Sequence, residues 1–156
     1  MRRLAPALVA AVVTSGVHAQ PFLPTERAAI ELVRSRHTDS LATVDGTLAY
    51  AERVTDGAFT RGGYRVVRRP GEPFARVQIC YRLGIDRPTC GLAYLVTVNP
   101  PHVEPAERYD GLARDLEHGP RAFLRALARE ADLQHQPAIL RRIEVALEPF
   151  NPYDWR

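Results

Sequence analysis

The chain has 156 residues, of which 46% are hydrophobic and 25% charged, which is typical of one globular domain with its own core. Its 21 basic and 18 acidic residues give a net charge of only +3, which argues against the clustered basic excess of nucleic-acid-binding proteins. Every basic residue is arginine, so reactions that need a lysine, such as Schiff-base formation, are excluded.

The N-terminus has the layout of a secretory signal peptide. A basic start precedes an apolar run of about ten residues, and Val17-His18-Ala19 places small residues before a cut at Gln20. The run is half of the roughly 20 residues that a membrane span needs. The sequence therefore predicts a cleaved signal peptide at 1–19 and a single globular domain at 20–156. The product is expected to be periplasmic or secreted, without a membrane span.

The first part of the domain predicts an amphipathic helix that begins after Thr25, a good N-cap residue. Its apolar stripe recurs every three or four positions and consists of Ile30, Val33, His37, Leu41, Val44, Leu48 and Ala51. Asp45-Gly46 lies within this pattern and either kinks one long helix or divides it into two. Because His37 lies on the stripe, we expect a partly buried, hydrogen-bonded core histidine.

The middle of the chain has the alternating pattern of β-strands. Tyr64–Arg69, Phe74–Leu83 and Thr89–Val98 are separated by short turn-forming stretches, which favour an antiparallel meander. Residues 58–61 are a candidate for a short fourth strand. Asn99-Pro100-Pro101 is expected to end the sheet.

The last part of the chain predicts two or three helices. Pro105 suits the first turn of one helix, Gly119-Pro120 ends it, and two further apolar repeats follow. The tail carries aromatic residues that we expect to fold back on the core: Phe150, Tyr153 and Trp155.

These elements define an α+β fold. We expect an N-terminal helix packed on an antiparallel three- or four-stranded meander, followed by two or three C-terminal helices. The element order is similar to that of cystatin-like and NTF2-like scaffolds, which host many unrelated functions. The order alone therefore implies no particular activity.

The two cysteines, Cys80 and Cys90, flank the turn between the second and third predicted strands. In an oxidising compartment they predict a cross-strand disulfide, with residue 78 opposite 92 and 76 opposite 94. Such a bridge stabilises a fold by roughly 2–3 kcal/mol. The spacing differs from the Cys-x-x-Cys pattern of thiol oxidoreductases.

Residues with catalytic or metal-binding spacing are scarce. The chain has no nucleophile elbow, zinc-binding helix or phosphate-binding loop. His102 and Glu104 are the nearest pair to a metal site, but acids there have a plainer role at a helix N-terminus. We therefore predict no cofactor and no metal site.

Arginines concentrate in the predicted sheet. Residues 56–90 contain seven arginines and three acids, and Arg76 and Arg82 share the strand face of the cysteines. Planar guanidinium groups suit carboxylates and phosphates. The predicted binding residues are Arg65, Arg68, Arg76 and Arg82.

Two classes of function follow. The first is a small exported non-catalytic binding module, such as an inhibitor, an immunity-type protein or an envelope-assembly accessory, that recognises a protein or anionic partner in the envelope. The alternative is a small periplasmic enzyme or apolar-ligand carrier with a pocket between the first helix and the sheet. In an enzyme, His37, Tyr81 and Tyr94 are the first candidates for acid–base or orienting groups.

Overall fold

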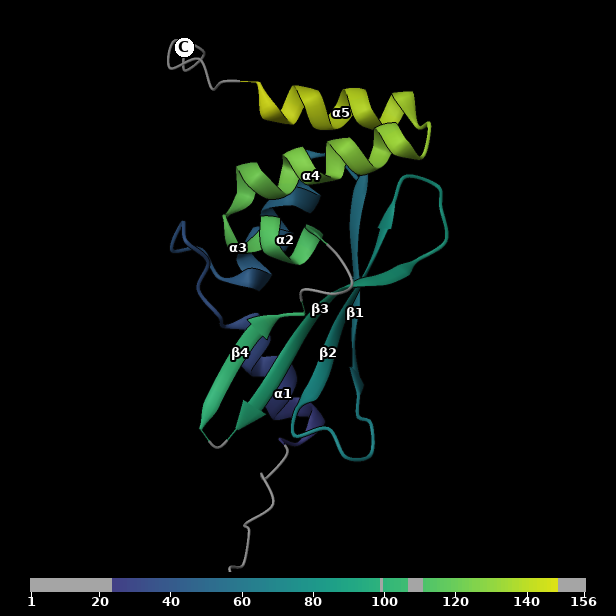
Figure 1. Cartoon of the computed structure of the whole chain (residues 1–156). Helices are drawn as coiled ribbons and strands as arrows, with labels where there is room; N and C mark the ends of the chain where they lie inside the picture. The colour runs from purple at the N-terminus through teal and green to yellow at the C-terminus, as the bar shows by residue number, and fades with distance from the viewer. Residues whose placement is uncertain (1–23, 99, 107–110, 149–156) are drawn as a thin grey trace, which may run out of the picture.

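The structure, a computed structural model, describes residues 24–98, 100–106 and 111–148 (Figure 1). It has an α+β fold in which helices precede and follow an antiparallel four-stranded sheet. The predicted signal peptide and the aromatic tail lie outside the described residues. The elements are α1 (Glu26–Arg34), α2 (Val44–Val54), β1 (Phe59–Val67), β2 (Ala75–Leu83), β3 (Thr89–Val98), β4 (Pro101–Pro105), α3 (Gly111–Glu117), α4 (Pro120–Leu133) and α5 (Pro137–Leu147).

The N-terminal helical stripe is divided into two helices, and the break lies at residues 35–43 rather than at Asp45-Gly46. The Thr25 hydroxyl accepts a hydrogen bond from the Ala28 amide and caps α1. Thr43 caps α2 in the same way, because its hydroxyl accepts from the Gly46 amide. Gly46 therefore lies in the first turn of α2, where its amide meets the cap.

The prediction that His37 is a core histidine is wrong. The residue lies in the break between the helices and is exposed, and its Nδ1 is 3.0 Å from the carbonyl oxygen of Leu41. Leu41 has a φ of 65° and is 82% exposed. Both residues match the helical period, but α1 ends at Arg34, His37 pairs with Thr43 in an isolated β-bridge, and Leu41 is in the left-handed region.

The sheet is a meander in the order β1-β2-β3-β4, and each neighbouring pair is antiparallel. The fourth strand is β4. Residues 58–61 do not form a separate strand, because Ala58 precedes β1 and residues 59–61 begin it. The sheet therefore does not end at Pro101, and Pro105 ends a strand instead of beginning a helix. Proline is tolerated here because β4 is an edge strand, where a missing amide donor can face away from the sheet.

The predicted disulfide is confirmed: Cys80 and Cys90 join β2 to β3. The register around it differs from the expected one, since Gln78 faces Ala93 and Arg76 faces Leu95. Ile79 faces Leu92 and Tyr81 faces Thr89, so β3 has one residue more than β2 in this interval. This extra residue displaces the pairing on one side of the bridge by one position.

The core lies between the helices and one face of the sheet. This inner face includes Val77, Ile79 and Tyr81, as the alternation predicts. Every described helix contributes to the same apolar cluster. The rings of Phe123 in α4 and Phe59 in β1 pack edge-to-face, with 5.5 Å between their centroids. Figure 1 shows α1 behind the sheet and α4 and α5 stacked at one end of it. Of the helices in the described residues, none has the length and apolarity that a membrane crossing requires.

Candidate binding surface and edge cleft

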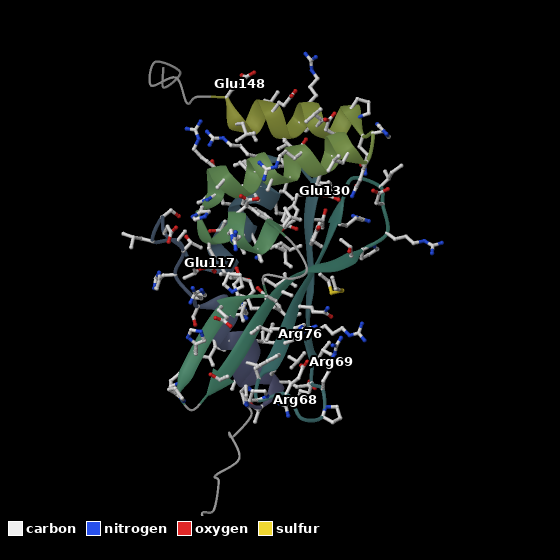
Figure 2. The ribbon with its side chains drawn as sticks, in the orientation of Figure 1. Arg68, Arg69, Arg76, Glu117, Glu130 and Glu148 are labelled. Atoms are coloured by element: carbon white, nitrogen blue, oxygen red, sulfur yellow. A yellow bond between two sulfur atoms is a disulfide. The ribbon has the colours of Figure 1, made fainter. Side chains whose placement is uncertain are left out.

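The side chains that point away from the helices form what we call the outer sheet face. On β2, buried and less buried residues alternate, so Arg76, Gln78, Cys80 and Arg82 share this face. Figure 2 shows Arg76 near the middle of the sheet, with Arg69 and Arg68 nearer the turn between β1 and β2. The described helices build their common core on the inner face, whereas on the outer sheet face Arg82 is exposed and Ala93, which faces Gln78, is buried.

Three of the four predicted binding arginines lie on the outer sheet face. Arg65 faces Gln78 and Arg76 faces Val67 in the register of β1 and β2. Arg65 and Arg76 are therefore diagonal neighbours, roughly 7–8 Å apart. Arg82 lies six residues beyond Arg76 on β2, roughly 20 Å away at the rise of an extended strand.

The fourth arginine, Arg68, has a different position. Its guanidinium group donates a hydrogen bond to the carbonyl oxygen of Pro24, immediately before the cap of α1. The contact joins the end of β1 to the start of the first helix across 44 residues of sequence. Arg68 is thus held toward the helical side and is separate from the other three.

The surroundings of these arginines are basic. Within the described part of the chain, Arg65 and Arg82 are exposed and have no hydrogen-bond or ion-pair partner. Arg76 is half-buried. Among the described strands, the outer sheet face carries one acidic residue, Glu104 on β4, which faces Leu95. Its Oε2 lies 3.1 Å from His102 Nε2. No group of three or more potential metal ligands occurs among the described residues.

A charged cleft, here called the edge cleft, lies where α1 and α2 meet the edge of the sheet. It has a volume of about 290 Å³ and is lined by Arg34, Asp45, Leu48, Glu52, Arg61, Gly62, Tyr64 and Ile79. The residues proposed for an enzyme pocket do not line it. His37 is exposed, Tyr94 is fully buried, and Tyr81 lines a separate cleft of about 220 Å³ beside α4.

Asp45 is at the centre of the edge cleft. Its Oδ1 accepts a hydrogen bond of 2.9 Å from the Tyr64 hydroxyl, and its Oδ2 accepts one of 3.4 Å from Arg34. Arg61 Nη1 lies 3.7 Å from Oδ1, while the Nε and backbone amide of Arg61 both donate to Glu52. These contacts hold two guanidinium groups and two carboxylates beside β1.

The pKa shifts in the edge cleft follow from these contacts. Burial acts to raise the pKa of Asp45, but the hydrogen bonds from Tyr64 and Arg34 outweigh it, so the pKa lies below its usual range. Burial and the hydrogen bond to Asp45 raise the pKa of Tyr64. Near neutral pH Asp45 is therefore ionised and Tyr64 protonated, and neither is suited to exchange protons there.

We expect the contribution of Asp45 to stability to depend on pH. A carboxyl whose pKa is lower in the folded state stabilises the fold above its unfolded pKa, here 3.8, and this contribution is lost as pH falls through the folded pKa. Asp45→Asn should thus lower the free energy of unfolding at neutral pH, and the difference from the unmodified protein should shrink below about pH 4. Urea denaturation over this pH range measures it.

The matched control is Asp132→Asn, which changes an exposed aspartate of α4 whose side chain has no hydrogen-bond or ion-pair partner among the described residues. Its difference from the unmodified protein should stay small at every pH. An Asp45→Asn difference that is constant from neutral to acidic pH would contradict the assignment.

No protein-family model, curated protein or solved structure matches this chain. The function must therefore be inferred from the outer sheet face, the edge cleft and the sequence pattern.

Proposed function

We propose that this protein is a small exported, non-catalytic module that binds an acidic protein partner through the outer sheet face. The observation that carries the proposal is a sheet face with Arg65, Arg76 and Arg82 on which none of the described helices builds its core. Guanidinium groups provide planar, bidentate recognition of carboxylates. Inhibitor, immunity-type and envelope-assembly roles all fit this description.

The spacing of the arginines favours a protein partner over a small anion. Arg82 is roughly 20 Å from Arg76 along β2, so one phosphate or carboxylate cannot contact both. A partner that engages all three arginines must present several acidic groups over a similar span. A protein surface has this size, because a standard interface buries roughly 800 Å² on each partner.

Two further observations support the proposal. The Cys80–Cys90 bridge is compatible with an oxidising compartment, as the N-terminal sequence also predicts. In the edge cleft, the pKa of Asp45 lies below and that of Tyr64 above its usual range, which disfavours acid–base catalysis near neutral pH. The bridge supports export, and the pKa directions support a binding role over acid–base catalysis by Asp45 and Tyr64.

The test is a pull-down from envelope extract with the tagged chain, followed by affinity measurement on the recovered partner. The double variant Arg65→Glu/Arg82→Glu changes two exposed side chains and should leave the fold intact. We expect the double charge reversal to weaken binding by at least ~10-fold, and added salt to weaken binding of the unmodified chain.

The matched control is Arg125→Glu/Arg141→Glu, which reverses two exposed arginines on α4 and α5. It changes the net charge equally but leaves the outer sheet face intact, so binding should be retained. Recovery of no stoichiometric partner, or equal loss of binding in both double variants, would count against the proposal.

A further inference from the structure

The two edges of the sheet differ in their capacity to accept another strand. The strand order places β1 and β4 at the edges. β4 has five residues and a proline at each end, whereas β1 has nine residues and no proline. Short, proline-containing edges resist strand addition because proline lacks the amide donor. β1 is therefore the edge that can accept an extended segment.

The first half of β1 is covered by the protein's own side chains. The Phe59 amide donates to the Thr55 hydroxyl at 3.1 Å, and the Arg61 amide donates to Glu52 at 3.0 Å. An irregularity in the pairing with β2 then separates Arg61 from Tyr64. Beyond it, residues 64–67 pair with β2, and no backbone partner on their other side occurs within the described residues. We call residues 64–67 the open edge.

The charge of the open edge indicates which kind of strand it accepts. Arg65 is exposed within it and has no partner among the described residues, and the exposed Arg69 follows shortly after. Antiparallel pairing with a second copy would bring these arginines close to their equivalents, and facing like charges are destabilising. An acidic segment would instead place carboxylates beside Arg65.

The edge cleft lies next to the open edge and shares Tyr64 with it. Alternate side chains of an added strand point to opposite faces of the sheet. Those on one face would lie beside Arg65, and those on the other would approach the edge cleft. Arg34 and Arg61 line that cleft, and Asp45 and Glu52 line it as well. Arg61 Nε donates to Glu52 at 2.8 Å, so the two arginines and the two carboxylates of the cleft balance in charge.

We propose that the open edge of β1 binds an extended acidic segment of the partner by strand addition. This inference rests on the proposed function and adds the mode of binding and the chemistry of the partner. Backbone hydrogen bonds to residues 64–67 hold the segment. Arg65 selects acidic side chains on one face, and the edge cleft admits the side chains on the other face.

The test is amide hydrogen exchange, measured by NMR on the exported full chain purified without reductant. The probe is a synthetic peptide of four Glu-Val repeats, which is acidic and favours the extended conformation. At saturating peptide we expect alternate amides of residues 64–67 to exchange at least ~10-fold more slowly, because strand addition pairs only the outward-facing groups. A Lys-Val peptide and a Glu-Val peptide with N-methylated alternate residues should give no protection.

The outcomes separate this inference from the proposed function. Peptide binding that Arg65→Glu/Arg82→Glu abolishes, without protection of residues 64–67, overturns strand addition and leaves the proposed function standing. Absence of peptide binding, or protection by the Lys-Val peptide, also overturns the inference, while the pull-down decides the function. Protection that grows with protein concentration in the absence of peptide identifies a second copy as the occupant and overturns the acidic segment.

Discussion

Glu117→Ala should lower the free energy of unfolding by about 2–3 kcal/mol, because it leaves a partly buried arginine without its acceptor. Both carboxylate oxygens of Glu117, at the end of α3, accept from Arg36 Nε at 2.9 Å, and Nη2 lies 2.9 Å from Oε2. The side chains of Glu117 and Arg36 are only 13% and 32% exposed. Chemical denaturation measures the loss.

A matched substitution on the same helix separates this effect from the loss of any acid. Asp115 contacts Arg129 at 2.7 Å, but the Arg129 side chain is 63% exposed. Asp115→Ala should therefore cost about 0.5 kcal/mol, as exposed ion pairs do. A double-mutant cycle of Glu117→Ala with Arg36→Ala gives the coupling energy directly. If Glu117→Ala and Asp115→Ala lowered the free energy of unfolding equally, the Arg36–Glu117 pair would stabilise the fold no more than an exposed ion pair does.

The same pair explains why the break between α1 and α2 could not be located from sequence. The apolar period continues through residues 35–43, and the Asp45-Gly46 pair offered the obvious local signal for a break. The segment is instead held by contacts to α3. Arg36 binds Glu117 across 81 residues, and the Asp39 amide donates to the Glu117 carbonyl oxygen. Such contacts have no local pattern, and tertiary packing overrides helical periodicity.

Local patterns did predict the features that depend on neighbouring residues. The α+β order, the limits of β3 and the face shared by Arg76 and Arg82 follow from alternation and turn chemistry. The fourth strand was missed because prolines end a central strand but are tolerated at an edge. Whether a strand lies at an edge depends on the order of the whole sheet.

The candidate site also has one part that the sequence predicts and one part that it does not. The outer sheet face follows from strand alternation, since side chains two residues apart share a face. The edge cleft does not, because Arg34, Asp45 and Tyr64 come from α1, α2 and β1 and meet only when these elements pack. Its sequence signal is weak: acids in α2 and Arg61 in β1 are each common on exposed surfaces.

Removal of the disulfide by Cys80→Ser and Cys90→Ser should lower the free energy of unfolding by about 2–3 kcal/mol, because the cross-link restricts the unfolded chain. The two residues are 10 apart in sequence, and the bridge sits where β3 has one more residue than β2. Without it, the pairing on its two sides is free to shift, and a shift by one residue would turn side chains to the opposite face. Guanidinium denaturation with and without reductant measures the stability effect: the unmodified protein should match the variant in reductant, and the variant should not respond to reductant. Equal stability of the oxidised and the fully reduced protein, with free thiols verified by mass spectrometry, would refute a stabilising role.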